Sequence, residues 1–371
     1  MMSMNVHERI IRALDHDEPD RVPTLAQYFE KPFIREVGRT LPPVQRFKWR
    51  FTQHLVIEVA RVLGFDAVWL HYNKQRVPRG ERPEIPSDVT KKFGLGEPNE
   101  WGHVSIRGSD GSKWYQDGVL KTPALVQDWI SYIKTWEAGA PKVYRHFKSV
   151  WVSSIKKGVV PIPTAGAVAW ITWSSIGLNR FAWMTRKHLG LVKDLAKAWG
   201  EFTRKQHDML FEQGIDLVFI CDDFALKART IYSPGKWESI IHPVYKMLAK
   251  HAHGHGARFL VHGDGNVEDV LPWIVKAGVD AIEPLEYEAG NRLRPLKERF
   301  GDDITLIGNV PATQVLTFGS VHDTIEMTKQ CIADAARGGG YVLGAGSDIL
   351  GTCKLDNVRA MVSTVKSHGR Y

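Results

Sequence analysis

The sequence predicts a (β/α)₈ TIM barrel, formed as a single domain over residues 1–371. Short runs rich in Val, Ile, Leu and Phe recur along the chain, and each is followed by polar residues and then by a helical pattern. This order is typical of buried parallel strands in repeated βα units. Eight such runs are present, as a closed barrel of this type requires. Several helical stretches also end in glycine, which readily adopts the left-handed conformation that ends a helix.

The predicted strands extend over most of the chain. Their ranges are Arg21–Gln27, Phe65–Leu70, Val159–Ala169, Asp216–Cys221, Arg258–Val261, Asp280–Leu285, Ile304–Ile307 and Tyr341–Leu343. The clearest helices are predicted at Leu189–Gln213, Pro234–His253, Val267–Ala277 and Val321–Arg337. The glycines that end them are Gly214, Gly256, Gly278 and the run from Gly338 to Gly340.

One segment between the second and third strands, about residues 95–125, departs from this alternation. Apolar and polar residues alternate on both sides of Ser109-Asp110-Gly111. An Asp-Gly pair supplies the positive φ angles of a tight hairpin turn. We therefore expect a β-hairpin insertion that lies at the mouth of the barrel.

Charge and cysteine content restrict the class of protein. The net charge is +8, but the Lys and Arg residues are scattered and no nucleic-acid recognition motif accompanies them. The three cysteines have no metal-type or disulfide-type spacing, which favours a reducing compartment. The first 18 residues lack an apolar signal region, and no apolar run reaches about 18 residues. We expect a cytoplasmic enzyme that binds neither nucleic acid nor membrane.

In barrels of this class, functional side chains lie at the C-terminal ends of the strands. Those positions carry acids, histidines and aromatic residues here, which predicts a catalytic pocket. The candidates for substrate binding are Tyr28, His71, Tyr72, Trp170, Asn309, Ser347 and Asp348.

The segment from His262 to Asn266 gives the strongest single signal, because a strand delivers His262 to the rim and then turns through two glycines. Imidazole nitrogen and carboxylate oxygen are Zn²⁺ ligands, so His262, Asp264 and Glu283 form a candidate metal site. Glu283 could instead fix the tautomer of the imidazole from behind. A third interpretation needs no metal, and in it His262 only forms hydrogen bonds within the polar rim.

Asp222 and Asp223 end the fourth strand. Adjacent residues of a strand point to opposite sides, so only one of the two can face the barrel axis. A general acid or base, or a substrate anchor, is one interpretation. A helix N-cap or an ion pair with a nearby cation is the other.

The alternating histidines His251, His253 and His255 resemble a metal-binding tract. They lie at a predicted helix end, away from the rim of the barrel. A solvated helix C-terminus, where positive charge is favoured, explains them better.

The chain also resembles a known family. The matching segments include Asp20–Pro23, Gly278–Ala281, Ile307–Pro311 and Gly340–Ile349. They resemble the uroporphyrinogen-decarboxylase superfamily, and in particular its corrinoid-dependent methyltransferase branch. The decarboxylases carry an Arg-rich segment after the first strand and a His in the last Gly-rich turn. This chain has neither, so decarboxylation of a porphyrinogen is not expected.

The thiol-methylating members of that branch bind zinc through a His-x-Cys motif and a distant Cys. Here His262 matches the histidine, whereas Asp264 and Ser347 stand in place of the two cysteines. A harder shell of nitrogen and oxygen ligands suits Lewis-acid activation of an oxygen substrate. The resemblance thus implies a Zn²⁺-assisted methyltransferase. It would move a methyl group between a small methylated substrate, such as a methyl ether, and a corrinoid (methylcobalamin) on a partner protein, with acid help from Asp222 or Asp223.

Two alternatives stay open at this point. One is a decarboxylase or lyase that acts without metal on a small non-porphyrin substrate. The other is a ligand-binding barrel that has no catalytic activity, because one fold can host sites with or without chemistry.

Overall fold

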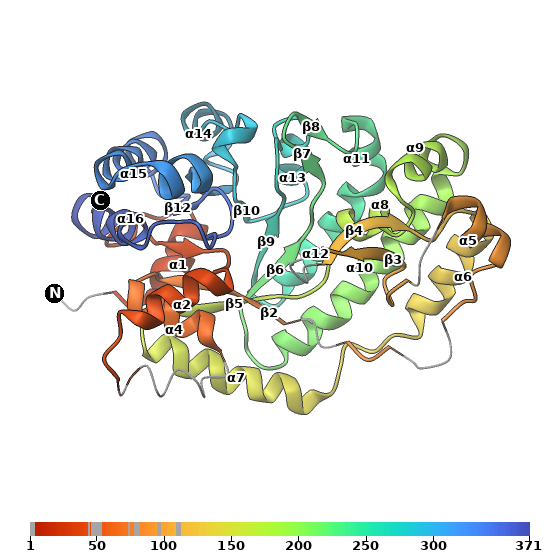
Figure 1. Ribbon diagram of the computed structural model, residues 1–371, viewed down its shortest axis with the longest axis horizontal. Helices are drawn as coiled ribbons and strands as arrows, with labels where there is room; N and C mark the ends of the chain where they lie inside the picture. The colour runs from red at the N-terminus through yellow and green to blue at the C-terminus, as the bar shows by residue number, and fades with distance from the viewer. Residues whose placement is uncertain are drawn as a thin grey trace.

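A computed structural model describes residues 4–43, 45, 54–72, 75–77, 82–94, 98–108 and 113–371. Within these residues, eight parallel strands form one sheet in the order β1-β2-β5-β6-β9-β10-β11-β12 (Figure 1). The strands are β1 (Leu25–Ala26), β2 (Ala67–His71), β5 (Val160–Thr164), β6 (Leu217–Cys221), β9 (Arg258–His262), β10 (Ala281–Glu283), β11 (Thr305–Val310) and β12 (Tyr341–Ala345). Leu343 N donates to Pro23 O at 2.9 Å and so joins the last strand to the residues just before the first. The predicted (β/α)₈ barrel is confirmed.

Helices surround the strands and follow most of them in the chain (Figure 1). They are α1 (Val6–Leu14), α2 (Lys31–Arg39), α4 (Leu55–Leu63), α5 (Ser87–Phe93), α6 (Pro123–Lys134), α7 (Pro141–Lys156), α8 (Ala169–Ser174), α9 (Leu178–Lys187), α10 (Leu189–Phe211), α11 (Pro234–Ile240), α12 (His242–Gly254), α13 (Leu271–Lys276), α14 (Leu293–Phe300), α15 (Val321–Ala335) and α16 (Leu355–His368), with a π-helix, η2 (Ala312–Phe318), and a 3₁₀ turn, η1 (Tyr287–Ala289). None of the helices in the described ranges combines the length and the apolar character needed to cross a bilayer.

Local sequence signals explain where several helices begin and end. Ser320 and Asp323 form a capping box at the start of α15, in which each side chain accepts a hydrogen bond from the other residue's backbone N–H. The single helix predicted over Pro234–His253 is divided at Ile241 into α11 and α12. Pro243 lies in the first turn of α12, where its missing N–H leaves no hydrogen bond unmade.

Strands β3 (His103–Arg107) and β4 (Lys113–Gly118) pair antiparallel between β2 and β5 in the chain. The turn predicted at Ser109-Asp110-Gly111 lies outside the described residues. Tyr115 Oη donates to Ser174 O at 2.8 Å, and His103 Nε2 lies 2.8 Å from Ser174 Oγ. These contacts pack the hairpin against α8, the helix that follows β5.

The opposite end of the barrel, where the strands begin, is held by buried charges. Asp66, just before β2, accepts hydrogen bonds from Arg9 Nη1 at 2.9 Å and Arg21 Nη2 at 2.7 Å. Arg9 also contacts Asp20 through two hydrogen bonds. This network ties α1 and the approach to β1 to the base of the sheet, so these charged residues serve the fold.

Candidate active site and metal centre

Strand register brings three chain-distant residues to the same level of the barrel. His262, the last residue of β9, is the Cα partner of Cys221 on β6 and of Glu283 on β10. Strands that run parallel and end together place the residues that follow them around one opening. His262, Glu283 and the acids after Cys221 therefore meet at the mouth.

Glu283 holds one side of the His262 ring. Its Oε2 lies 2.9 Å from His262 Nδ1, and both side chains are only 2% exposed. Burial raises the pKa of Glu283 to about 7, although the hydrogen bond to His262 opposes that shift. A carboxylate at Nδ1 fixes a proton there, so Nε2 is the nitrogen that would lose its proton and bind a metal.

Two further carboxylates lie at the other side of the ring. Asp223 Oδ1 is 3.1 Å and Asp264 Oδ1 is 3.6 Å from His262 Nε2. One ligand atom from each of these three residues lies within 4.8 Å of the others. Both Oδ1 atoms are buried, and within the part of the chain that the structure describes they have no hydrogen-bond donor besides His262 Nε2. Their side chains are nevertheless 45% and 41% exposed, so the trio lies between the barrel interior and solvent.

The two glycines of the His262-Gly263-Asp264-Gly265 turn allow this arrangement. A Cβ on Gly263 would lie 2.3 Å from the ring of Phe224, which follows Asp223 in the chain. Gly265 has a φ of +83°, and a Cβ there would lie 2.6 Å from Leu226 O. Only residues without a side chain let the two segments approach so closely. The turn thus brings Asp264 beside Asp223.

Negative charge exceeds positive charge around this cluster. Burial and repulsion by Asp264 raise the pKa of Glu286 to about 7. Burial also raises the pKa of Asp348 to about 6, with Asp264 and Asp223 adding to the shift while His262 opposes it. Burial lowers the pKa of His262, but the nearby acids, Asp264 foremost among them, outweigh it and raise that pKa well above its usual value.

The cluster fits a divalent cation. Asp223 Oδ1, Asp264 Oδ1 and His262 Nε2 lie close enough to one another to bind a single ion. An imidazole nitrogen with two carboxylate oxygens is a donor set that Zn²⁺ accepts, and three protein ligands leave a position open for substrate. A bound cation would also relieve the mutual repulsion of the acids. These residues therefore fit the Zn²⁺ that the family resemblance implies. Asp223 lies beside Nε2 of His262, and Glu283 lies beside Nδ1 of the same ring.

Asp222 points away from this trio. Its carboxylate is fully buried and accepts hydrogen bonds from Val168 N, Ala169 N and Trp170 N, all at 2.8 to 2.9 Å. Tyr245 Oη donates to it at 2.8 Å. Burial raises the pKa of Asp222, and these hydrogen bonds oppose the shift. Asp222 thus anchors the first turn of α8, while Asp223 faces His262.

Several predicted substrate-binding residues do lie near the cluster. The rings of Tyr28 and His71 are 5.7 Å apart, and His71 Nδ1 lies 3.1 Å from Thr164 Oγ1. Burial and the charge of His262 lower the pKa of His71. Trp170 contacts the hairpin instead: its backbone N–H donates to Asp222, and its ring lies 4.7 Å from that of His103. Ser347 and Asp348 are half-buried after β12, and Asp348 interacts electrostatically with His262.

Two predicted residues face away from the mouth. Tyr72 is buried against Tyr144 and Phe147, and its hydroxyl donates to Val143 O on α7. Asn309 is buried on the outside of β11, where its amide donates to Asn291 O at 3.1 Å. The structure does not bring either of them to the cluster.

Trp69 on β2 is a neighbour of the site that the strand-end rule misses. Its ring lies 4.8 Å from that of His262 at an interplanar angle of 87° and 4.4 Å from Phe219. It covers the imidazole from inside the barrel. Trp69 is two residues before His71, so the alternation of the strand places both on the same face.

The family model described as uroporphyrinogen decarboxylase (URO-D) matches residues 157–368. Among solved structures, the chain is similar to a methyltransferase from Methanosarcina mazei, with 17% identity, a TM-score of 0.68 and coverage of 98% of this chain and 99% of that one. That likeness supports the barrel fold.

A B12-independent methionine synthase from Shewanella sp. W3-18-1 is more distant, with 12% identity, a TM-score of 0.46 and coverage of 94% and 97%. No curated protein sequence matches the chain. The family match spans more than half of the residues and includes β6, β9, β10 and the cluster around His262. This chain belongs to the uroporphyrinogen decarboxylase family.

Proposed function

We propose that the protein is a methyltransferase that moves a methyl group between a small methylated compound, such as a methyl ether, and a corrinoid cofactor carried by a partner protein. Zn²⁺ held by Asp223, His262 and Asp264 would act as a Lewis acid on the heteroatom that bears the methyl group. The observation that carries this proposal is the convergence of two buried oxygens, Asp223 Oδ1 and Asp264 Oδ1, on His262 Nε2 at 3.1 and 3.6 Å.

The protein's own residues would prepare this site. Glu283 keeps the proton of His262 on Nδ1. Trp69 covers the ring and excludes water from the barrel side. Asp222 fixes the start of α8 and with it Trp170. We therefore assign Asp222 a positioning role, in place of the acid catalysis expected from its sequence position.

His71 would contribute to substrate binding. Its lowered pKa keeps the imidazole neutral near pH 7, so it can form a hydrogen bond to a substrate heteroatom without adding positive charge. The ring of Tyr28 beside it supplies an apolar surface for the substrate.

The donor set favours an oxygen-linked methyl group over a thiol. Carboxylate ligands are harder than thiolates, and a metal bound by them retains more Lewis acidity toward an oxygen atom. Cys221 lies close to the cluster, but burial raises its pKa to about 12, so it stays a neutral thiol at pH 7.

The test supplies the purified, Zn²⁺-loaded protein with reduced cobalamin and a panel of methoxylated and methylated amine compounds. We expect a spectral change to methylcobalamin with an oxygen-linked donor. Asp264→Asn should abolish zinc binding at the mouth and lower the rate by about 100-fold, since it removes a charged ligand. Asp128→Asn, on the exposed face of α6, is the matched control and should change neither.

Three results would contradict the proposal. Full activity of metal-stripped protein would exclude the metal role. Release of CO₂ from a small acid without metal would favour a lyase. Thermal stabilisation by a methylated compound without any turnover would favour a binding protein.

A further inference from the structure

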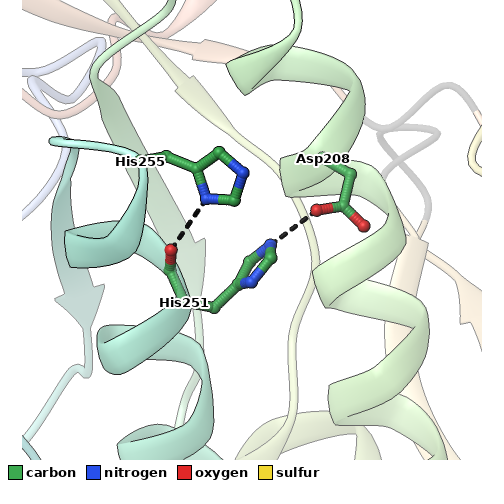
Figure 2. A group of neighbouring side chains, drawn as sticks. All are labelled: Asp208, His251 and His255. Carbon is green, nitrogen blue, oxygen red and sulfur yellow. Dashed lines mark hydrogen bonds and ion pairs between the residues drawn. The ribbon is translucent and has the colours of Figure 1, made fainter.

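A second group of potential ligands lies on the outer surface of the barrel, between α10 and α12. It consists of Asp208 from α10 with His251 and His255 from the end of α12 (Figure 2). One ligand atom from each residue lies within 4.8 Å of the others. The two histidines are four residues apart, so they share a face of the helix. Helix packing adds Asp208, which the sequence pattern of histidines alone does not reveal.

Hydrogen bonds orient all three side chains toward one another. His255 Nδ1 lies 2.9 Å from His251 O, so this nitrogen carries the proton and Nε2 keeps a free lone pair. Figure 2 shows that this second nitrogen of His255 is on the side of the ring turned toward α10. His251 Nε2 lies 2.5 Å from Asp208 Oδ1. Arg204 Nη1 donates to the other oxygen, Asp208 Oδ2, at 2.9 Å, which leaves Oδ1 for the histidines.

We propose that Asp208, His251 and His255 form a second site for a divalent transition metal of the Zn²⁺ type, separate from the cluster at the barrel mouth. The metal would take the place of the proton that His251 and Asp208 share, and that proton would be released to solvent. A groove of about 560 Å³ beside the histidines gives solvent access to the remaining coordination positions.

The surroundings determine the strength and the effect of this site. Lys246 and Lys250 line the same groove, and their charge opposes a cation. We therefore expect weaker binding than at the mouth, where acids dominate. A metal here would add coordinate bonds to the contact between Asp208 on α10 and His251 on α12, and would stabilise that face of the barrel.

The experiment measures zinc equivalents bound to metal-stripped full-length protein by equilibrium dialysis and elemental analysis. Wild type should bind two equivalents, His255→Ala one and Asp264→Asn one. The double variant should bind none. His322→Ala removes an exposed imidazole from α15 and should still bind two.

A second measurement separates metal binding from a folding defect. His255 is exposed, so His255→Ala should have the same circular dichroism and melting temperature as wild type without metal. Added Zn²⁺ should then raise the melting temperature of Asp264→Asn but not that of the double variant. If His255→Ala binds as many equivalents as wild type, the second site is excluded. If only Asp264→Asn keeps both equivalents, the assignment at the mouth fails and the second site stands.

Discussion

Glu283 and His262 form a buried carboxylate–imidazole pair at the level where β9 and β10 end, with 2.9 Å between Oε2 and Nδ1. The two ring nitrogens of His262 therefore have different neighbours: Nδ1 contacts Glu283, and Nε2 faces Asp223 and Asp264. Carboxylate partners of this kind orient metal-binding histidines and increase their basicity.

Glu283→Gln should weaken Zn²⁺ binding by about 10- to 100-fold, because the neutral amide no longer fixes and polarises the imidazole. The dissociation constant is measured by competition with a chromophoric chelator. Glu298→Gln, on the exposed side of α14, is the control. Equal affinity of the two variants would show that Glu283 does not act through His262.

Asp222 and Asp223 allow a comparison between adjacent residues. Asp222→Asn should lower the free energy of unfolding by about 3–5 kcal/mol, because an NH₂ group would face the backbone donors at the start of α8. Asp223→Asn should leave the free energy of unfolding nearly unchanged, since its side chain is nearly half exposed. It should reduce metal affinity, since it removes a charged ligand. Urea unfolding of both variants provides the measurement. Equal stabilities would overturn the division of roles.

Gly265→Ala should disturb the metal site through the backbone. Its φ of +83° disfavours any side chain, by about 1–2 kcal/mol, and the new Cβ would meet Leu226 O. The segment must shift, and Asp264 shifts with it. Gly235→Ala, where a Cβ has open space in α11, is the control. Metal content and unfolding free energy should fall only for Gly265→Ala, and a Gly265→Ala protein with normal zinc content would contradict this account.

His207 makes stability depend on pH. Burial lowers its pKa to about 4, whereas the unfolded chain has the ordinary value of about 6.5. Between these values the unfolded state binds more protons, so stability falls as the pH decreases from about 6.5 to about 4. The full loss is on the order of 3 kcal/mol. His207→Gln should show a shallower dependence when unfolding free energies are measured across this range. An unchanged slope would assign the dependence to other groups, such as His103, whose pKa burial also lowers to about 4.

The sequence predicted the barrel well because buried parallel strands have a strong signature. The first strand was predicted over Arg21–Gln27, but the strand itself comprises only Leu25–Ala26, with a bridge from Thr24 to Leu343, because Pro23 cannot donate a hydrogen bond and Arg21 binds Asp66. The third was predicted to extend to Ala169 and ends at Thr164, where the chain turns toward α8.

The candidate site was harder to predict. The end of a strand shows which residues lie at the mouth of the barrel, but not which of their side chains point into it. Phe219, Cys221 and Asp223 share one face of the fourth strand, so knowing that Phe219 faces inward would have selected Asp223 over Asp222. By the same alternation, the side chains of His71 and Tyr72 point to opposite faces of the strand. The contact between Asp208 and His251 had no sequence signal, since it depends on how α10 packs against α12.

The link between Leu343 and Pro23 has a consequence for synthesis of the protein. The segment that precedes β1 receives its hydrogen bond from one of the last strands to leave the ribosome. Until then, one side of β1 and one side of β11 expose unpaired backbone groups, which favour association with other chains. We therefore expect a nascent chain that stalls before residue 341 to expose two open sheet edges and to associate with other chains more readily than the closed barrel does.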